Sequence, residues 1–141
     1  MNGDYIISTD KAKLEIDIIH DFLSNRSYWA KGRSLEIVRR SIDHSLCFGA
    51  YDQADRQVGF ARVITDFAVL AYLLDVFVLE DHRGRGVGKL LVKSIVEHPD
   101  LKGVRVWRLD TQDAHGLYKK FGFTDIKFPD RVMEIRRPPP R

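Results

Sequence analysis

A glycine-rich segment, Arg83-Gly84-Arg85-Gly86-Val87-Gly88-Lys89, lies between an apolar run that ends at Val78 and a stretch with helical spacing. Alternate glycines let a ligand approach the backbone, and the first turn of a helix presents unpaired N–H groups with partial positive charge. These features together favour a bound phosphate. Arg83, Arg85 and Lys89 oppose the helix dipole until an anion binds. The alternative is a glycine-rich turn with solvated arginines.

Two common phosphate-binding motifs do not match this segment. A P-loop would need Gly in place of Arg83 and Ser or Thr in place of Leu90. A dinucleotide-binding fingerprint would need Gly in place of Lys89, although Asp110 falls near the place of its ribose-binding acid. If the segment binds an anion, it does so through another motif.

Asp75 interrupts the apolar run Leu73-Leu74-Asp75-Val76-Phe77-Val78. A carboxylate in a buried strand is costly unless it is paired or faces a cleft. Because side chains alternate along a strand, Asp75 is predicted to share a face with Leu73 and Phe77. The run therefore predicts either a buried ion pair or a carboxylate in a binding cleft.

The composition indicates one globular domain. The chain has 141 residues, of which 44% are hydrophobic and 30% charged. These values are typical of a single soluble domain, which we place at residues 1–137, followed by a short Pro-rich tail at 138–141. The formal net charge is only +3. The basic residues are not interleaved with aromatic residues in a stacking arrangement, so we predict no binding of nucleic acid.

Several absences in the sequence favour a cytoplasmic protein. Cys47 is the single cysteine, and the start Met1-Asn2-Gly3-Asp4 has no basic region followed by an apolar stretch. The longest apolar stretch, Phe67 to Leu79, is shorter than the ~20 residues of a spanning helix. The five histidines show no metal-ligand spacing. We therefore expect a cytoplasmic location, no membrane segment and no metal.

The elements that would position these residues follow from periodicity and turn residues. Strands are predicted over 5–8, 46–51, 58–64, 69–78, 104–109, 123–128 and 132–135, and helices around 14–23, 35–42, 87–95 and 114–121. The run 69–78 is apolar on both faces, which indicates a central strand. The crossover from 69 to 109 joins parallel strands, so the sequence predicts an α/β (α+β) fold with a mixed sheet covered by helices.

Two segments together resemble the GNAT family of N-acetyltransferases. Arg83-Gly84-Arg85-Gly86-Val87-Gly88 is similar to the family's Arg/Gln-x-x-Gly-x-Gly/Ala signature, which also follows a hydrophobic strand. Ala114-His115-Gly116-Leu117-Tyr118-Lys119-Lys120-Phe121-Gly122-Phe123 is similar to the family's later Ala-x-x-x-Tyr-x-x-x-Gly-Phe segment. The separation of the segments and the order of elements also fit, so the resemblance covers nearly the whole chain.

The resemblance implies a fold and a cofactor site. The sheet would be mostly antiparallel, flanked by about four helices, and would splay between its fourth and fifth strands to admit acetyl-CoA. The CoA pyrophosphate would lie on the backbone amides of Arg83, Gly84, Arg85, Gly86, Val87, Gly88 and Lys89. Main-chain groups of Phe77 and Val78 would pair with the pantetheine arm like an added strand. Thr111 stands where many relatives have an Asn that contacts the CoA arm.

The resemblance also implies catalytic and acceptor-binding residues. Tyr118 matches the tyrosine that serves as general acid to the CoA sulfur. Asp75 lies on the strand that often supplies an acid to bind or deprotonate the acceptor amine, and the alternative is an ion pair with Arg62 or Arg108. The loop over residues 24–33 commonly lines the acceptor pocket. There Tyr28, Trp29 and Arg33 would suit an acceptor with an aromatic, apolar or carboxylate-bearing part.

The expected function is direct transfer of an acetyl group from acetyl-CoA to a primary amine of a small molecule. Two alternatives are acetylation of a protein N-terminus or lysine, and a module that binds CoA without turnover. Relatives often dimerise through late strands, so Phe123 to Ile135 would mediate a homodimer here.

Overall fold

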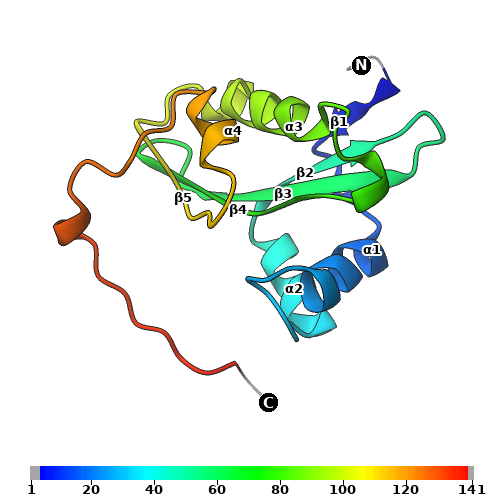
Figure 1. The fold of residues 1–141 in the computed structure, drawn as a ribbon, viewed down its shortest axis with the longest axis horizontal. Helices are drawn as coiled ribbons and strands as arrows, with labels where there is room; N and C mark the ends of the chain where they lie inside the picture. Colours follow the sequence, from blue (N-terminus) through cyan, green and yellow to red (C-terminus); the bar gives the residue numbers. More distant parts are fainter. Residues whose placement is uncertain (1–3, 140–141) are drawn as a thin grey trace.

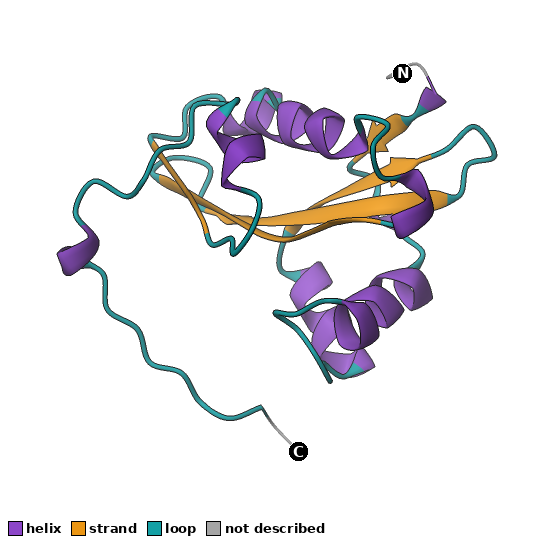
Figure 2. Cartoon of the chain, in the orientation of Figure 1, coloured by secondary structure: helices purple, strands orange, loops and turns teal. Residues whose placement is uncertain are grey.

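A computed structural model describes residues 4–139; the predictions for residues 1–3 and for residues 140 and 141 of the tail lie outside this range. Five strands form one sheet in the order β1-β2-β3-β4-β5 (Figure 2). All neighbours are antiparallel except β4 and β5, which are parallel. The strands are β1 (Ile6–Ser8), β2 (Leu46–Tyr51), β3 (Gln57–Thr65), β4 (Leu70–Val78) and β5 (Val106–Leu109). The predicted mixed, mostly antiparallel sheet is confirmed.

Four α-helices cover the two faces of this sheet (Figure 1). On one face lie α1 and α2, and on the other lie α3 and α4. Their bounds are α1 (Ile16–Asp21), α2 (Leu35–Asp43), α3 (Val87–Val96) and α4 (His115–Lys119). A π-helical turn (Phe22–Arg26) extends α1, and 3-10 turns occupy Lys11–Lys13, Glu80–His82, Pro99–Leu101 and Pro129–Arg131. The sequence periodicity predicted the four α-helices in their observed order.

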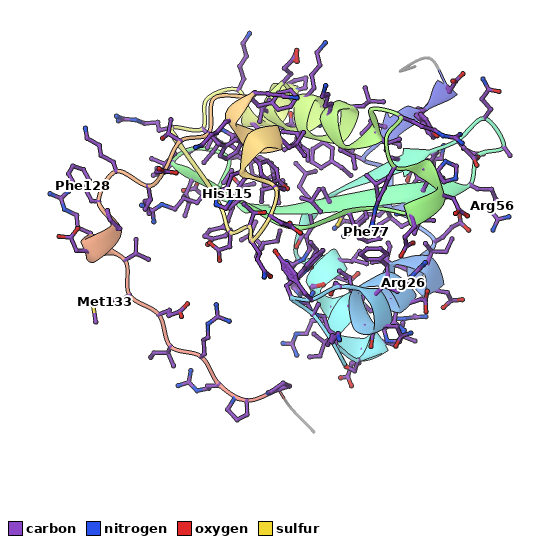
Figure 3. All side chains as sticks on the ribbon, viewed as in Figure 1. Arg26, Arg56, Phe77, His115, Phe128 and Met133 are labelled. Carbon is purple, nitrogen blue, oxygen red and sulfur yellow. The ribbon has the colours of Figure 1, made fainter. Side chains whose placement is uncertain are left out.

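Each face of the sheet has its own hydrophobic core. The core on the α3 side contains Leu73 from β4 together with Leu91 and Ile95 from α3. The core on the α1 and α2 side contains Phe77, which stacks on Phe22 at 4.2 Å between ring centroids (Figure 3). The strand β4 therefore contributes to both cores and ties the two helical layers together.

The sheet opens between its last two strands. Pairing of β4 with β5 runs only from Leu70 to Leu73 on β4, opposite Val106 to Leu109. The rest of β4, residues 74–78, pairs with β3 alone. A strand edge without a neighbouring strand leaves backbone N–H and C=O groups open to a ligand. The splay between the fourth and fifth strands is thus present.

A β-bulge at Asp75 corrects one prediction about the strand. Phe60 pairs with Phe77 and Arg62 with Leu74, so one residue of β3 faces two of β4. Asp75 has a positive φ of 55°. The extra residue breaks the alternation of side chains that we assumed. Leu73 consequently lies in the α3-side core and Phe77 in the opposite one, so the prediction that Asp75 shares a face with both was wrong.

The two predicted late strands, 123–128 and 132–135, are also absent from the described part of the chain. This segment leaves the body beside β5 and extends away from it, with Phe128 and Met133 on its length (Figure 3). Pro129 begins a 3-10 turn there, and Arg131 stacks on the Phe128 ring at 3.7 Å. Proline lacks the N–H that a strand ladder requires, and among residues 4–139 no neighbouring strand pairs with this segment.

Candidate active site

A cleft of about 380 Å³ lies where the sheet opens, between the end of β4, the start of α3 and the helix α4. Its walls include backbone and side chains of the glycine-rich segment together with the unpaired end of β4. The residues that line it are Val76, Phe77, Val78, His82, Arg83, Gly84, Gly86, Val87, Gly88, Ala114, Leu117 and Tyr118. The fold therefore brings the glycine-rich segment and the segment that contains Tyr118 to one cavity.

The glycine-rich segment shapes the floor of this cleft through its backbone. Gly84 and Gly86 have φ values of 78° and 83°, in the left-handed region that favours glycine. Gly86 is the N-cap of α3, and no side chain caps this helix end. The first N–H groups of the helix are thus free of a side-chain acceptor and carry partial positive charge. Arg83 donates from Nε to the Val78 carbonyl at 3.1 Å, which ties the segment to β4.

Three residues predicted to contact the cofactor do not line the cleft. The side chains of Arg85 and Lys89 are exposed at the surface next to it. The Thr111 hydroxyl accepts a hydrogen bond from the Ala114 N–H at 3.1 Å, so it holds the turn that leads into α4. The remaining predicted cofactor residues do line the cleft: Phe77, Val78, Arg83, Gly84, Gly86, Val87, Gly88 and Tyr118.

Tyr118 is almost fully buried at the cleft wall, with 7% of its surface exposed. Its ring packs edge-on against Phe123 at 5.8 Å between centroids. Burial raises the pKa of Tyr118 to about 12, with smaller contributions from the nearby Tyr28 and Asp113. The hydroxyl is therefore protonated at neutral pH and can donate a proton or a hydrogen bond into the cleft.

Tyr28 connects the loop before α2 with the loop before α4. Its hydroxyl accepts a hydrogen bond from the Gln112 N–H at 2.9 Å, across 84 residues of sequence. The Tyr28 ring contacts Trp29 edge-on, with centroids 5.1 Å apart. Both rings are partly exposed, at 46% and 42%. They form an aromatic wall that links the loop before α4 to Asp75, and neither side chain lines the cleft.

Asp75 is held by three donors on the α1 and α2 side of the sheet. Trp29 Nε1 donates to Oδ1 at 2.9 Å, while Arg33 and Arg62 donate to Oδ2 at 2.8 Å and 2.6 Å. Arg62 also donates to the Ser45 hydroxyl at 3.2 Å. The Asp75 side chain is only 2% exposed. Of the two ion pairs predicted as alternatives, the one between Asp75 and Arg62 forms. The second partner of Asp75 is Arg33 and not Arg108.

These donors determine the charge of Asp75. Burial raises the pKa of its carboxyl, but the guanidinium groups of Arg62 and Arg33 and the Trp29 N–H outweigh burial, and the net pKa is lowered. Asp75 is consequently ionised at neutral pH. Both of its oxygens already accept hydrogen bonds, which leaves little basicity for removing a proton from an ammonium group.

Several residues of the site were not proposed from sequence. Val76, His82, Ala114 and Leu117 line the cleft, and Gln112 binds Tyr28. Ala114 and Leu117 share a helical face with Tyr118, and that spacing is a signal that finds them. No sequence signal points to Gln112, because its backbone N–H makes the contact.

Two classes of site are absent from residues 4–139. No group of three or more His, Cys, Asp or Glu side chains there is arranged to hold a metal ion. Within the same range, every helix is too short or too polar to span a bilayer.

Comparisons with known proteins define the class of this site. Residues 43–125 match the profile of the acetyltransferase (GNAT) domain. A crystal structure from Xanthomonas campestris pv. campestris, described as belonging to the GNAT family, has 52% sequence identity and a TM-score of 0.91. The similarity covers 95% of this chain and 94% of that one. The fold is thus that of a GNAT acetyltransferase.

Two relatives found by sequence similarity are also acetyltransferases by name. A peptidyl-lysine N-acetyltransferase, YjaB of Salmonella typhimurium, is 32% identical over 89% of this chain and 79% of its own. A protein of Gibberella zeae whose name places it among acetyltransferases is 31% identical over 94% of this chain and 86% of its own. The chain belongs to the GNAT family of N-acetyltransferases.

Proposed function

We propose that the protein transfers an acetyl group from acetyl-CoA directly to a primary amine of a small molecule. The observation that carries this proposal is the single cleft that joins an uncapped helix N-terminus, an unpaired strand edge and a protonated tyrosine. Members of this family act on amines, and the donor supplies a thioester whose acyl carbon the amine attacks. What remains is the role of each side chain.

The residues at the cleft fit a CoA group. The free N–H groups at the start of α3 suit a pyrophosphate, because they offer several donors and no competing side-chain acceptor. Residues 74–78 offer an unpaired backbone edge that can bind an amide-bearing arm as an added strand. Arg85 and Lys89 lie outside the lining, so we propose that they attract the anionic ligand at longer range.

Tyr118 is the proposed acid. Amide formation takes one proton from the acceptor nitrogen and places one on the departing sulfur. Because a thiol has a pKa of about 8.5, complete transfer from a tyrosine whose pKa is about 12 is uphill. We therefore propose that Tyr118 donates a hydrogen bond to the sulfur as negative charge develops. Any proton that it gives up is replaced from the acceptor nitrogen.

Asp75 is proposed as a positioning residue rather than the base. Its lowered pKa and its three donors oppose proton abstraction, whereas its contacts fix Trp29 and Arg33 in place. The ion pair holds the loop before α2 against β4. The acceptor amine would then enter in its neutral form or lose its proton to water.

Acetylation of a protein lysine is the second candidate. It is favoured by the similarity to a relative named as a peptidyl-lysine N-acetyltransferase. Against it, the loop that we propose to bind the acceptor carries two neighbouring aromatic side chains and a guanidinium, which suit a small amine with a flat part.

The test is the release of free CoA thiol by purified protein with acetyl-CoA and three acceptor groups. These groups are free amino acids, simple aliphatic and aromatic amines, and lysine-containing peptides with blocked termini. Turnover with free amines supports the proposal, and turnover confined to the peptides replaces it with the second candidate. Tight binding of CoA by calorimetry without turnover on any acceptor supports the non-catalytic alternative.

We also propose that the protein forms a homodimer and works in the cytoplasm. β5 is one of the two edge strands of the sheet, and exposed apolar side chains lie on the extended segment that follows α4. These side chains are Ile126, Phe128, Val132, Met133 and Ile135. Sedimentation equilibrium of the full chain tests the dimer, and a monomer at micromolar concentration contradicts it. The single cysteine, Cys47, suits a reducing compartment.

A further inference from the structure

The cluster around Asp75 holds more positive than negative charge. One carboxylate faces two guanidinium groups, and both ion pairs end on the same oxygen, Oδ2. Taken together, Asp75, Arg33 and Arg62 carry a net charge of +1. Since partly buried charge without a counterion is costly, such a cluster favours a further anion.

The two arginines are not equivalent. Arg62 is 11% exposed at its side chain and uses two of its nitrogens, one toward Asp75 and one toward Ser45. Arg33 is 22% exposed at its side chain and uses only NH1 toward Asp75. Within residues 4–139 its guanidinium has no second hydrogen-bond acceptor. Asp75 would keep Arg62 and Trp29 as partners even if Arg33 turned toward a ligand.

The backbone around Arg33 is fixed, so this guanidinium has a defined position. The backbone N–H of Arg33 donates to the Ala30 carbonyl at 3.0 Å, and the backbone carbonyl of Arg33 is hydrogen-bonded to the His20 ring at 3.1 Å. Gly32, with a φ of 76°, makes the turn, and Ser34 caps the next helix. Trp29 shares Asp75 with Arg33, and Tyr28, whose ring contacts Trp29, accepts a hydrogen bond from the loop before α4, the helix that carries Tyr118.

We propose that the acceptor is an amine that also carries a carboxylate, and that Arg33 binds this carboxylate while the aromatic wall contacts the rest of the molecule. The inference rests on the proposed function and narrows its substrate class. A planar guanidinium binds a carboxylate with two parallel hydrogen bonds, and one edge of Arg33 remains available for this. Arg33 thereby sets specificity and orients the amine toward Tyr118.

The test compares tyrosine with tyramine, which differ by one carboxylate. The kcat/KM ratio of tyrosine to tyramine is measured for the wild type and for Arg33→Gln. Dividing one ratio by the other cancels the difference in amine basicity. We expect the ratio to fall at least tenfold in Arg33→Gln, which corresponds to about 1.4 kcal/mol. Arg33→Lys keeps the positive charge but not the planar guanidinium, so its kcat/KM ratio should lie between those of the wild type and Arg33→Gln.

Arg39→Gln is the matched control, because Arg39 is an exposed cation on α2 outside the Asp75 cluster. Its ratio should equal that of the wild type. Thermal unfolding of each variant verifies that the fold is retained. An unchanged ratio in folded Arg33→Gln, or a wild type that prefers tyramine or blocked lysine peptides, overturns the inference while leaving acetyl transfer intact.

A binding measurement separates this inference from the proposed function. The probe is 3-(4-hydroxyphenyl)propionate, which has the ring and carboxylate of tyrosine but no amine. Calorimetry in the presence of CoA should show binding to the wild type and at least tenfold weaker binding to Arg33→Gln. If no amine is acetylated but this difference is seen, the carboxylate site stands and the proposed function fails. Equal affinities for both proteins contradict the site.

Discussion

The two sides of β4 are built by different means. On the α3 side, the cleft combines side chains such as Tyr118 with three backbone features: a helix N-terminus, two glycines with positive φ and an unpaired strand edge. On the α1 and α2 side, the site is formed by side chains, with Asp75 bound to Trp29, Arg33 and Arg62. Backbone suits a group shared by all reactions of a family. Side chains can be exchanged, which suits the part that varies between substrates.

Tyr118 lines the cleft on the α3 side, and its replacement should have the largest effect. Tyr118→Phe removes the hydroxyl and keeps the ring that packs on Phe123. We expect kcat to fall about 10²–10⁴-fold, as for loss of a general acid, with the affinity for CoA nearly unchanged. Steady-state kinetics and calorimetry measure the two quantities. A kcat within threefold of the wild type would remove Tyr118 from the chemistry.

Asp75→Asn tests how much the ion pairs of Asp75 contribute to the stability of the fold. The change leaves two partly buried guanidinium groups without their carboxylate. We expect a loss of about 3–5 kcal/mol in the free energy of unfolding, measured by chemical denaturation at pH 7. The exposed Asp125→Asn is the control and should change stability by less than about 0.5 kcal/mol.

The pH dependence of that loss has a definite sign. The folded-state pKa of Asp75 is lowered from its ordinary value of 3.8. Its stabilisation is therefore fully present above the unfolded pKa, and it is lost as pH falls through the lower folded pKa. The stability gap between wild type and Asp75→Asn should stay constant from pH 7 to about pH 5 and narrow below pH 4. A gap that narrows between pH 7 and pH 5 would contradict the assigned direction.

Gly86→Asp tests whether the backbone at the start of α3 binds the CoA phosphates. Aspartate at this position combines strain at a φ of 83° with a negative charge where an anion would bind. We expect the affinity for CoA to fall about 100-fold, with catalysis lost in proportion at low donor concentration. Gly86→Ala shares the strain without the charge and should lose less. Equal affinities for Gly86→Asp and the wild type would place the CoA phosphates elsewhere.

The smallest effect is expected for Lys89→Gln. Lys89 is exposed and lies outside the cleft lining, so its attraction to an anion is screened by salt. We expect the affinity for CoA to fall less than about threefold at physiological ionic strength, and somewhat more at low salt. A tenfold loss that persists at high salt would indicate direct contact with the ligand.

The local features of the fold were predictable from sequence. The loop and helix around Gly86 follow from glycines next to an apolar helical pattern, and the face of α4 follows from the spacing of Ala114, Leu117 and Tyr118. The segment 123–135 was predicted wrongly as strands. Its β-favouring residues need a neighbouring strand, and the described chain provides none there.

The partners of Asp75 show why the rest was not predictable. Arg33 is 42 residues away in sequence and Arg62 is 13, and neither separation favours them over Arg108. The β-bulge in β4 determines which side chains Asp75 meets. One extra residue in β4 moves Asp75 out of the alternation that includes Leu73, and it meets the loop before α2. No local pattern in the sequence marks that extra residue.

The sequence by itself therefore determined the family, the order of the four α-helices and five strands, and a glycine-rich loop at the start of α3, because these depend on residues that lie within a few positions of each other. Only the tertiary structure decided the contacts of Asp75 and the net charge of the cluster around it. There, strand register brings Arg33, Arg62 and Trp29 to one carboxylate, and the Tyr28 hydroxyl meets Gln112 across 84 residues. Contacts at such separations depend on how the whole sheet and its helices pack, which no short segment encodes.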